Sequence, residues 1–378
     1  MSKVIIKQIS TYDYAVVSQA VKEIFEGLGG IDKVIKPGHR VLVKPNLLGP
    51  SRPEEAIVTH PMVIRAVVEC VLEAGGQPFV SDSPAMGSWK KLLSETGLAR
   101  RLEGLNVELR PFTRSKAVEA ASPFKKIELA VDALEADIVI NIPKLKTHSQ
   151  MLLTLSIKNM FGCVVGMKKP EWHYRAGIHT DYFAKLLVTI HDLIKPCFTI
   201  MDGIVGMEGD GPGKSGIPRP LGVLLGSRHG LAVDVTVCRM LGFSPERLAT
   251  NTAAMQDMGH SADAIEIDGD LPKIQGFKLP DTGGLLFGPK FIHKWLRKYF
   301  LRRPLSDKEL CQLCGKCQKY CPALAIEHEK NRLIMSYEKC IRCFCCVEVC
   351  PFGAMKTEVP IGGKLLQLKN ELVINKHL

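Results

Sequence analysis

The chain has 378 residues, a formal net charge of +11 and 46% hydrophobic residues. That size and apolar content suffice for one large core and a smaller unit, so we expect about two to three domains. No run of about 18 apolar residues occurs, which argues against a transmembrane helix. The start, MSKVIIKQIS, lacks the apolar region of a signal peptide. We therefore expect a cytoplasmic protein.

The first 280 residues alternate short apolar runs with amphipathic stretches. Strands are predicted for HRVLVK (39–44), QPFVSD (77–82), ADIVINI (136–142) and CFTIMD (197–202). Helices are predicted around 64–72 and for DYFAKLLVTIHDLIKP (181–196), LAVDVTVCRMLG (231–242) and SPERLATNTAAM (244–255). This alternation predicts an α/β fold with a mainly parallel sheet covered by helices.

Polar side chains follow each of the four predicted strands. They are Lys44 and Asn46 after the first, Asp82 after the second, Lys144, Lys146 and His148 after the third, and Asp202 at the end of the fourth. Ligands of open α/β sheets bind outside the carboxyl ends of strands, so we expect one shared site.

The expected site is rich in positive charge, which suits phosphate or carboxylate. Lys158 and His173 are further candidates for positive charge, and Glu208 is a further acid. The stretch GMEGDGPGKSG is not a P-loop, because Glu208 stands where the first glycine belongs. Its glycines would still let the backbone approach an anion.

A short basic segment, KFIHKWLRKYFLRR (290–303), contains no acidic residue. A nucleic-acid surface would spread basic patches and aromatics over a domain, so we do not expect nucleic acid as a partner. The segment places apolar residues on one helical face and basic residues outside it. Such a helix can lie on an anionic membrane, but we favour a linker helix packed on a domain.

Nine of the thirteen cysteines lie between Cys311 and Cys350. Clustering of this kind indicates metal or redox chemistry, not disulfides. CQLCGKCQKYCP (311–322) and CIRCFCCVEVCP (340–351) both follow C-x2-C-x2-C-x3-C-P. Cys345 fits neither frame.

The segment from about 305 to 356 resembles the bacterial two-cluster ferredoxin domain. In such domains the fourth cysteine of each run binds the other cluster. The resemblance thus implies one 4Fe-4S cluster on Cys311, Cys314, Cys317 and Cys350, and another on Cys340, Cys343, Cys346 and Cys321. Structural zinc is the alternative, but zinc sites usually pair C-x2-C halves without trailing prolines.

Several motifs over residues 2–265 resemble, in order, the domain-of-unknown-function family 362. They are KPNLL, SDSP, DIVINIPKLKTH, SIKNMFGCVVG, MDGIVGMEGDGP and AVDVTVCRMLG. Members often carry a two-cluster ferredoxin domain after this region. The resemblance therefore implies this domain architecture, but it does not indicate a substrate. It also supports one functional set: Lys44, Asn46, Asp82, Lys144, Lys146, His148, Lys158, Asn159, His173 and Asp202.

We therefore expect an α/β domain at 1–280, a linker at 281–304, a ferredoxin domain at 305–356 and a tail at 357–378. The function we favour is a ferredoxin-type electron-transfer oxidoreductase with a redox partner protein. A small anionic substrate would be bound by that set and Glu208, with His148 or His173 as proton donor. Two alternatives remain: a non-catalytic carrier that docks a partner enzyme, and a regulatory protein that responds to iron or oxygen.

Overall fold

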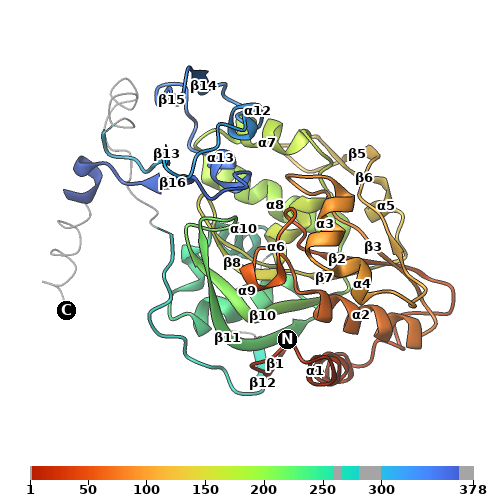
Figure 1. Cartoon of the computed structure of the whole chain (residues 1–378). Coiled ribbons are helices and arrows are strands. Elements are labelled where there is room, and N and C mark those ends of the chain that lie inside the picture. Colours follow the sequence, from red (N-terminus) through yellow and green to blue (C-terminus); the bar gives the residue numbers. More distant parts are fainter. Residues whose placement is uncertain (1, 259–264, 281–298, 366–378) are drawn as a thin grey trace, which may run out of the picture.

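The computed structural model describes residues 2–258, 265–280 and 299–365. Its centre is a sheet with the strand order β12-β1-β11-β10-β7-β2-β3-β4 (Figure 1). The strands span Ile265–Asp268, Ser2–Gln8, Gly216–Ser227, Phe198–Gly209, Ile138–Ile142, Arg40–Pro45, Gln77–Val80 and Glu108–Leu109 in that order. From β10 to β4 every pairing is parallel, while β11 is antiparallel to both β10 and β1. The predicted mainly parallel α/β fold is confirmed.

Helices cover both faces of this sheet. Along β2, Val41 and Val43 pack in the core that contains α1 and α2, whereas Leu42 packs in the core that contains α8 and α10. The first face carries α1 (Tyr14–Gly27), α2 (Pro61–Glu73), α3 (Trp89–Glu95) and α4 (Leu98–Arg101). The other carries α6 (Ser156–Asn159), α7 (Lys168–Ala176), α8 (Thr180–Ile194), α9 (Gly230–Met240) and α10 (Ala249–Met258). Since neighbouring side chains of a strand point to opposite faces and both faces are covered, the central stretches Val41–Val43 and Ile138–Ile140 are wholly apolar.

Local signals explain the ends of the predicted helices. His60 caps α2 by accepting the Met62 amide at 3.2 Å, and Pro61 occupies its first turn. α8 ends at Lys195 in the left-handed conformation, immediately before Pro196. The expected helix over 244–255 is divided instead: a 3-10 turn (Pro245–Arg247) is followed by an extended residue, Leu248, and then by α10.

Smaller elements complete the α/β region. β8 (Lys144–His148) pairs with β10 and with β9 (Leu152–Thr154). A separate hairpin joins β5 (Ser115–Glu119) to β6 (Lys126–Ala130), followed by α5 (Val131–Leu134). The remaining turns of 3-10 helix are Pro53–Glu55 and Met160–Cys163.

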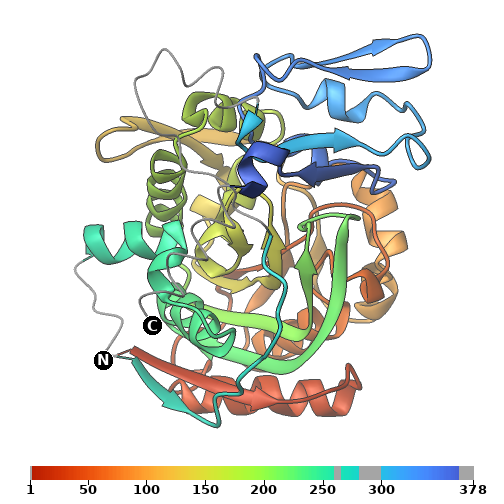
Figure 2. The same cartoon turned by 90° about the vertical axis from the view of Figure 1, so that its left-hand side faces the viewer.

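The cysteine-rich segment forms a small α+β unit at one end of the α/β domain (Figures 1 and 2). Its elements are β13 (Arg303–Ser306), α12 (Lys316–Lys319), β14 (Ile326–Glu329), β15 (Arg332–Met335), α13 (Cys345–Glu348) and β16 (Met355–Glu358). β13 pairs with β16, and β14 with β15, both antiparallel. We call this unit the ferredoxin segment.

The turn between β10 and β11 holds the ferredoxin segment against the α/β domain. Arg302 pairs with Asp210, and Ser215 Oγ donates to the carbonyl of Met355 at 2.9 Å. A Cβ added to Gly213 would lie 2.9 Å from the Glu348 carbonyl, so only glycine permits this approach.

Most of the expected basic helix at 290–303 and of the C-terminal tail lies outside the described residues. Within the described ranges, every helix is too short or too polar to cross a bilayer.

Candidate functional site

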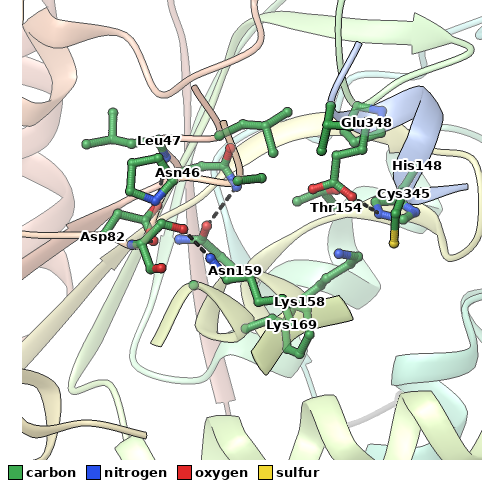
Figure 3. A pocket seen from close by; sticks show the side chains of 18 of the residues that line it. Asn46, Leu47, Asp82, His148, Thr154, Lys158, Asn159, Lys169, Cys345 and Glu348 are labelled. Atoms are coloured by element: carbon green, nitrogen blue, oxygen red, sulfur yellow. Dashed lines mark hydrogen bonds and ion pairs between the residues drawn. The ribbon is translucent and has the colours of Figure 1, made fainter. Parts of the chain in front are cut away.

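The parallel strands bring their polar end groups to one edge of the sheet. Lys44 lies near the end of β2, Asp82 follows β3, and β8 continues from the end of β7. At this edge the α/β domain and the ferredoxin segment enclose a cavity of about 140 Å³, which we call the junction cavity (Figure 3). Eight residues of the predicted set line it: Lys44, Asn46, Asp82, Lys146, His148, Lys158, Asn159 and His173.

Lys144 and Asp202 do not line the cavity but form a neighbouring buried pair. The Lys144 Nζ to Asp202 Oδ2 distance is 2.8 Å, and both side chains are almost fully buried. Tyr12 donates to Asp202 Oδ1 at 2.7 Å, and the His60 amide donates to Oδ2 at 2.9 Å. Every charge here is matched within the protein, so the cluster stabilises the fold around the site.

Glu208 lies elsewhere as well. β10 continues past Asp202 to Gly209, and Glu208 there pairs with Arg219 of β11 at 2.8 Å. It also accepts the amide of Lys278 at 3.0 Å. These contacts fasten the stretch around residue 278 to the sheet.

One wall of the junction cavity comes from the ferredoxin segment and was not predicted. Its residues are Tyr320, Cys345, Glu348 and Val349. Glu348 Oε2 lies 3.9 Å from His148 Nε2 (Figure 3). One feature of the sequence was consistent with a role for this wall: Cys345 is the cysteine that fits neither of the two cluster-binding frames.

Three of the four lysines of the cavity, Lys146, Lys158 and Lys169, have no carboxylate in direct contact among the ion pairs of the described residues. Lys169 donates to the carbonyl of Ser83. Lys44 pairs with Asp82 at 3.0 Å, but Lys146 donates to the carbonyl of Ile57 at 2.6 Å, and Lys158 lies over the Phe161 ring. Burial lowers the pKa of Lys146 to about 7 and also lowers the pKa of Lys158. An anion in the cavity would stabilise the charged form of both lysines and so raise both pKa values.

Both histidines are neutral near pH 7. Burial lowers the pKa of His148 well below its usual value and that of His173 to about 3. His148 Nδ1 accepts the amides of Gln150 and Met151, so the ring proton of the neutral form lies on Nε2. That Nε2 has no hydrogen-bond partner within the described structure, and neither has His173 Nδ1.

The cysteines form two groups that cross between the runs. Cys311, Cys314, Cys317 and Cys350 line one small pocket. In the other group, burial raises the pKa of Cys321, and the thiols of Cys343 and Cys340 raise it further. Over the described residues no three His, Cys, Asp or Glu side chains are close enough to share one metal ion. A 4Fe-4S cube is instead held at four corners, so its ligands lie farther apart.

The backbone of the two runs repeats the same turns. Leu313 and Arg342 have positive φ at matching positions, as do Gly315 and Phe344. Such angles cost about 1–3 kcal/mol at non-glycine residues and persist where the surroundings hold them, commonly at functional sites. The amide of Ala325 donates to Cys321 Sγ at 3.3 Å, as the amides around a cluster do. These residues fit two similar iron–sulfur clusters.

An α/β domain with a site at its carboxyl edge, joined to paired cysteine runs, defines an iron–sulfur electron-transfer protein. The chain belongs to the family described as domain of unknown function (DUF362), whose model matches residues 41–239. Residues 303–351 match the model of a 4Fe-4S dicluster domain. Both resemblances expected from the sequence are confirmed.

Relatives cover different parts of the chain. A thylakoid-associated protein of Synechocystis sp. is 35% identical over 299 residues, which is 77% of this chain and 92% of that protein. A ferredoxin of Pyrobaculum islandicum is 43% identical over 63 residues, 16% of this chain and 55% of the ferredoxin. The electron transport protein HydN of Escherichia coli is 37% identical over 57 residues, 15% and 33% of the two chains.

A solved structure of lactate racemase apoprotein from Thermoanaerobacterium thermosaccharolyticum aligns with a TM-score of 0.38 and 9% identity. The alignment covers 58% of this chain and 54% of that one.

Proposed function

We propose that this protein is an oxidoreductase with two 4Fe-4S clusters that acts on a small anionic substrate held in the junction cavity. One cluster would be held by Cys311, Cys314, Cys317 and Cys350, and the other by Cys340, Cys343, Cys346 and Cys321. Such clusters supply electrons one at a time. In this proposal the α/β domain at 1–280 binds the substrate, the linker is 281–304, the ferredoxin domain is 305–356 and the tail is 357–378.

The observation that carries this proposal is the shared wall of the cavity. Lys146, Lys158 and His148 face a wall that contains Cys345 and Glu348. Cys345 immediately precedes Cys346, a proposed cluster ligand. A substrate in the cavity would therefore lie next to the second cysteine group, while the buried lysines supply its counter-charge.

The residues of this chain divide the remaining work. Lys146 and Lys158 would bind the anion, and His148 would donate a hydrogen bond from Nε2. The role of proton donor, expected for His148 or His173, fits Lys146 better, because the pKa of Lys146 is about 7 and that of His173 about 3. A general acid works best when its pKa is close to the working pH.

The cluster count gives the first prediction. Protein purified without oxygen should contain about eight iron and eight acid-labile sulfide per chain, as two such clusters require. Iron and sulfide assays check this. Stoichiometric zinc without sulfide, or about four of each, would contradict the proposed pair of clusters.

The function is tested by following reoxidation. The full chain is reduced without oxygen, and a panel of organic acids and phosphates is screened for compounds that restore the visible absorption of the oxidised clusters. We expect a small anion to do so in the wild type and much more slowly in Lys158→Met. Lys3→Met is the control, because Lys3 pairs with Asp268 on the surface. A panel that reoxidises wild type and Lys158→Met equally would overturn the proposal.

The pH dependence of binding is a second prediction. In the empty cavity Lys146 begins to lose its proton near pH 7, and its charge is also influenced by Glu348, Lys158, Lys144 and Asp82. A bound anion favours the protonated amine, so affinity should be highest below about pH 7. It should fall by up to about tenfold per pH unit above that.

Titration calorimetry of an anion found in the screen, at pH 6–9 and in buffers of different ionisation enthalpy, measures this proton uptake. Lys146→Met should remove the part of the dependence near pH 7 and leave the part near pH 8, where Lys169 loses its proton because burial lowers its pKa to about 8. An affinity that stays constant across this range in the wild type would contradict the role of Lys146.

A carrier that docks a partner enzyme is the second candidate, and one observation favours it. Cys314 is exposed, and Phe352, which lines the same pocket, is 46% exposed. The surface around Cys314 and Phe352 would contact the redox partner whether the protein is an oxidoreductase or a carrier. If no anion reoxidises the reduced wild type but a partner protein does, the carrier function is the better one.

The expected cytoplasmic location is part of the proposal, because exposed iron–sulfur ligands such as Cys314 are best kept in a reducing compartment. A peripheral membrane contact is the alternative that we favour less. It is supported by the basic sequence of residues 290–303 and by the name of the Synechocystis relative.

A further inference from the structure

The charges of the junction cavity favour an anion over a zwitterion. Four lysines and two carboxylates line it, which leaves a formal excess of two positive charges. Lys44 is matched by Asp82, and Lys169 donates to the carbonyl of Ser83. Neither Lys169 nor Lys146 nor Lys158 has a carboxylate in direct contact among the ion pairs of the described residues, and Glu348 offsets one of these three charges, so the excess is shared among the three lysines. A ligand with both an ammonium and a carboxylate group would leave that excess unchanged, whereas a carboxylate reduces it.

The cavity also holds a fixed hydrogen-bond acceptor. Asn141 Nδ2 donates to the carbonyl of Ser156 at 3.0 Å, so its Oδ1 accepts from Asn159 Nδ2 at 2.8 Å. Asn159 Nδ2 also donates to the carbonyl of Lys44 at 3.3 Å, and Asn159 Oδ1 accepts from Asn46 Nδ2 at 2.9 Å. This relay of three amides fixes the orientation of Asn46.

Asn46 Oδ1, at the end of this relay, is buried and has no donor within the described structure. A buried acceptor left without a donor is costly, and native proteins rarely tolerate it. Because the relay prevents the amide from turning over, the donor has to come from a ligand or a water that enters the cavity. An O–H group meets this need without adding positive charge.

The volume sets the size of that ligand. The cavity measures about 140 Å³, and a cavity of about 150 Å³ holds one benzene molecule. A carboxylate with a chain of two to about four carbons fits.

We propose that the junction cavity binds a short hydroxycarboxylate, with its carboxylate at Lys146 and Lys158 and its hydroxyl donating to Asn46 Oδ1. This inference rests on the proposed function and names the class of anion bound at its site. In a reaction with the clusters the hydroxy acid would give up two electrons and two protons to become the oxo acid, and the reverse reaction, with the oxo acid as acceptor, would reoxidise reduced clusters. The hydroxyl distinguishes the ligand from other small acids, and the negative charge distinguishes it from neutral alcohols and amides.

The test compares probes that differ in one group. Glycolate and acetate differ only in the hydroxyl, as do 2-hydroxybutyrate and butyrate, and glycolamide lacks the charge. Binding to the oxidised full-length holoprotein is measured by titration calorimetry without oxygen. At least one hydroxy acid should bind about tenfold or more tightly than its deoxy partner, because a buried acceptor gains its donor. Glycolamide should bind more weakly than glycolate.

Variants assign the two contacts. Asn46→Ala should remove the preference for the hydroxy acid and leave the affinity for the deoxy acid unchanged. Lys158→Met should weaken both, and Lys3→Met neither. Iron content is measured for each variant, so that a lost cluster is not read as a lost contact.

The outcomes separate this inference from the proposed function. If hydroxy and deoxy acids bind alike, or if Asn46→Ala retains the preference, the hydroxycarboxylate assignment is overturned while the anion site stands. If none of the acids binds, the assignment is overturned, and the reoxidation screen then decides on its own whether another anion is the substrate.

Discussion

Replacing Cys346 by alanine should remove about half of the iron, whereas replacing Cys345 by alanine should leave the iron content unchanged. Cys346 belongs to the second cysteine frame, and Cys345 belongs to neither. Iron–sulfur ligands are held at fixed spacings, so a neighbouring thiol cannot replace a lost one without moving the backbone. Iron and sulfide per chain, together with the visible spectrum, measure the difference.

A second readout supports the assignment. Metal binding and folding are coupled, so Cys346→Ala should also make the ferredoxin segment more sensitive to proteolysis. Cys345→Ala serves as the matched control, because both thiols are buried in the same helix, α13. Equal iron content in the two variants would show that the frame is wrong.

Asp202→Asn should lower the free energy of unfolding by about 3–5 kcal/mol, because it leaves the buried ammonium of Lys144 without its counter-charge. The side chains of Lys144 and Asp202 are 1% and 0% exposed. The same carboxylate also accepts Tyr12 and the His60 amide. Denaturant unfolding of the holoprotein measures the loss.

Two controls show whether the unpaired charge is the cause. The double variant Lys144→Met and Asp202→Asn removes both charges and should lose less stability than Asp202→Asn alone. Glu208→Gln breaks a pair whose Arg219 side chain is 29% exposed, so its cost should be about 1 kcal/mol or less. If Glu208→Gln costs as much as Asp202→Asn, burial of the pair is not the reason.

The sequence predicted the core strands well, because each is a short apolar run that stays buried on both faces. Their parallel order then brought Lys44, Asp82 and the β8 residues to one edge, as expected from α/β topology alone. Eight of the eleven predicted site residues of the α/β domain line one cavity for that reason.

Strand geometry explains the three that do not. Lys144 and Lys146 are two residues apart on β8, but the register places Lys144 opposite Asp202 of β10. Lys144 and Asp202 therefore pair with each other beside the cavity. The predicted strand ended at Asp202, whereas β10 continues through Glu208. Its side chain there pairs with Arg219 of β11 instead of lining the cavity.

The wall from the ferredoxin segment could not be predicted, because nothing in a local pattern indicates which surface a distant domain covers. Glu348 approaches His148 across about half the chain, and their contact depends on Gly213 and Arg302 holding the two parts together. Only the leftover cysteine, Cys345, marked that surface in the sequence.

The shared wall has an evolutionary consequence. Glu348 and Cys345 belong to a ferredoxin-type unit by sequence but face His148 and Lys158 of the other domain. A generic ferredoxin in this place would keep its cysteine frames and lose the fit of the cavity. Selection would then act on these four positions together. Their residue types would covary among family members, whereas the sequence of the exposed β14–β15 hairpin would vary independently of them. The fusion of the two domains would on this view be a single inherited unit, and not an interchangeable pair of modules.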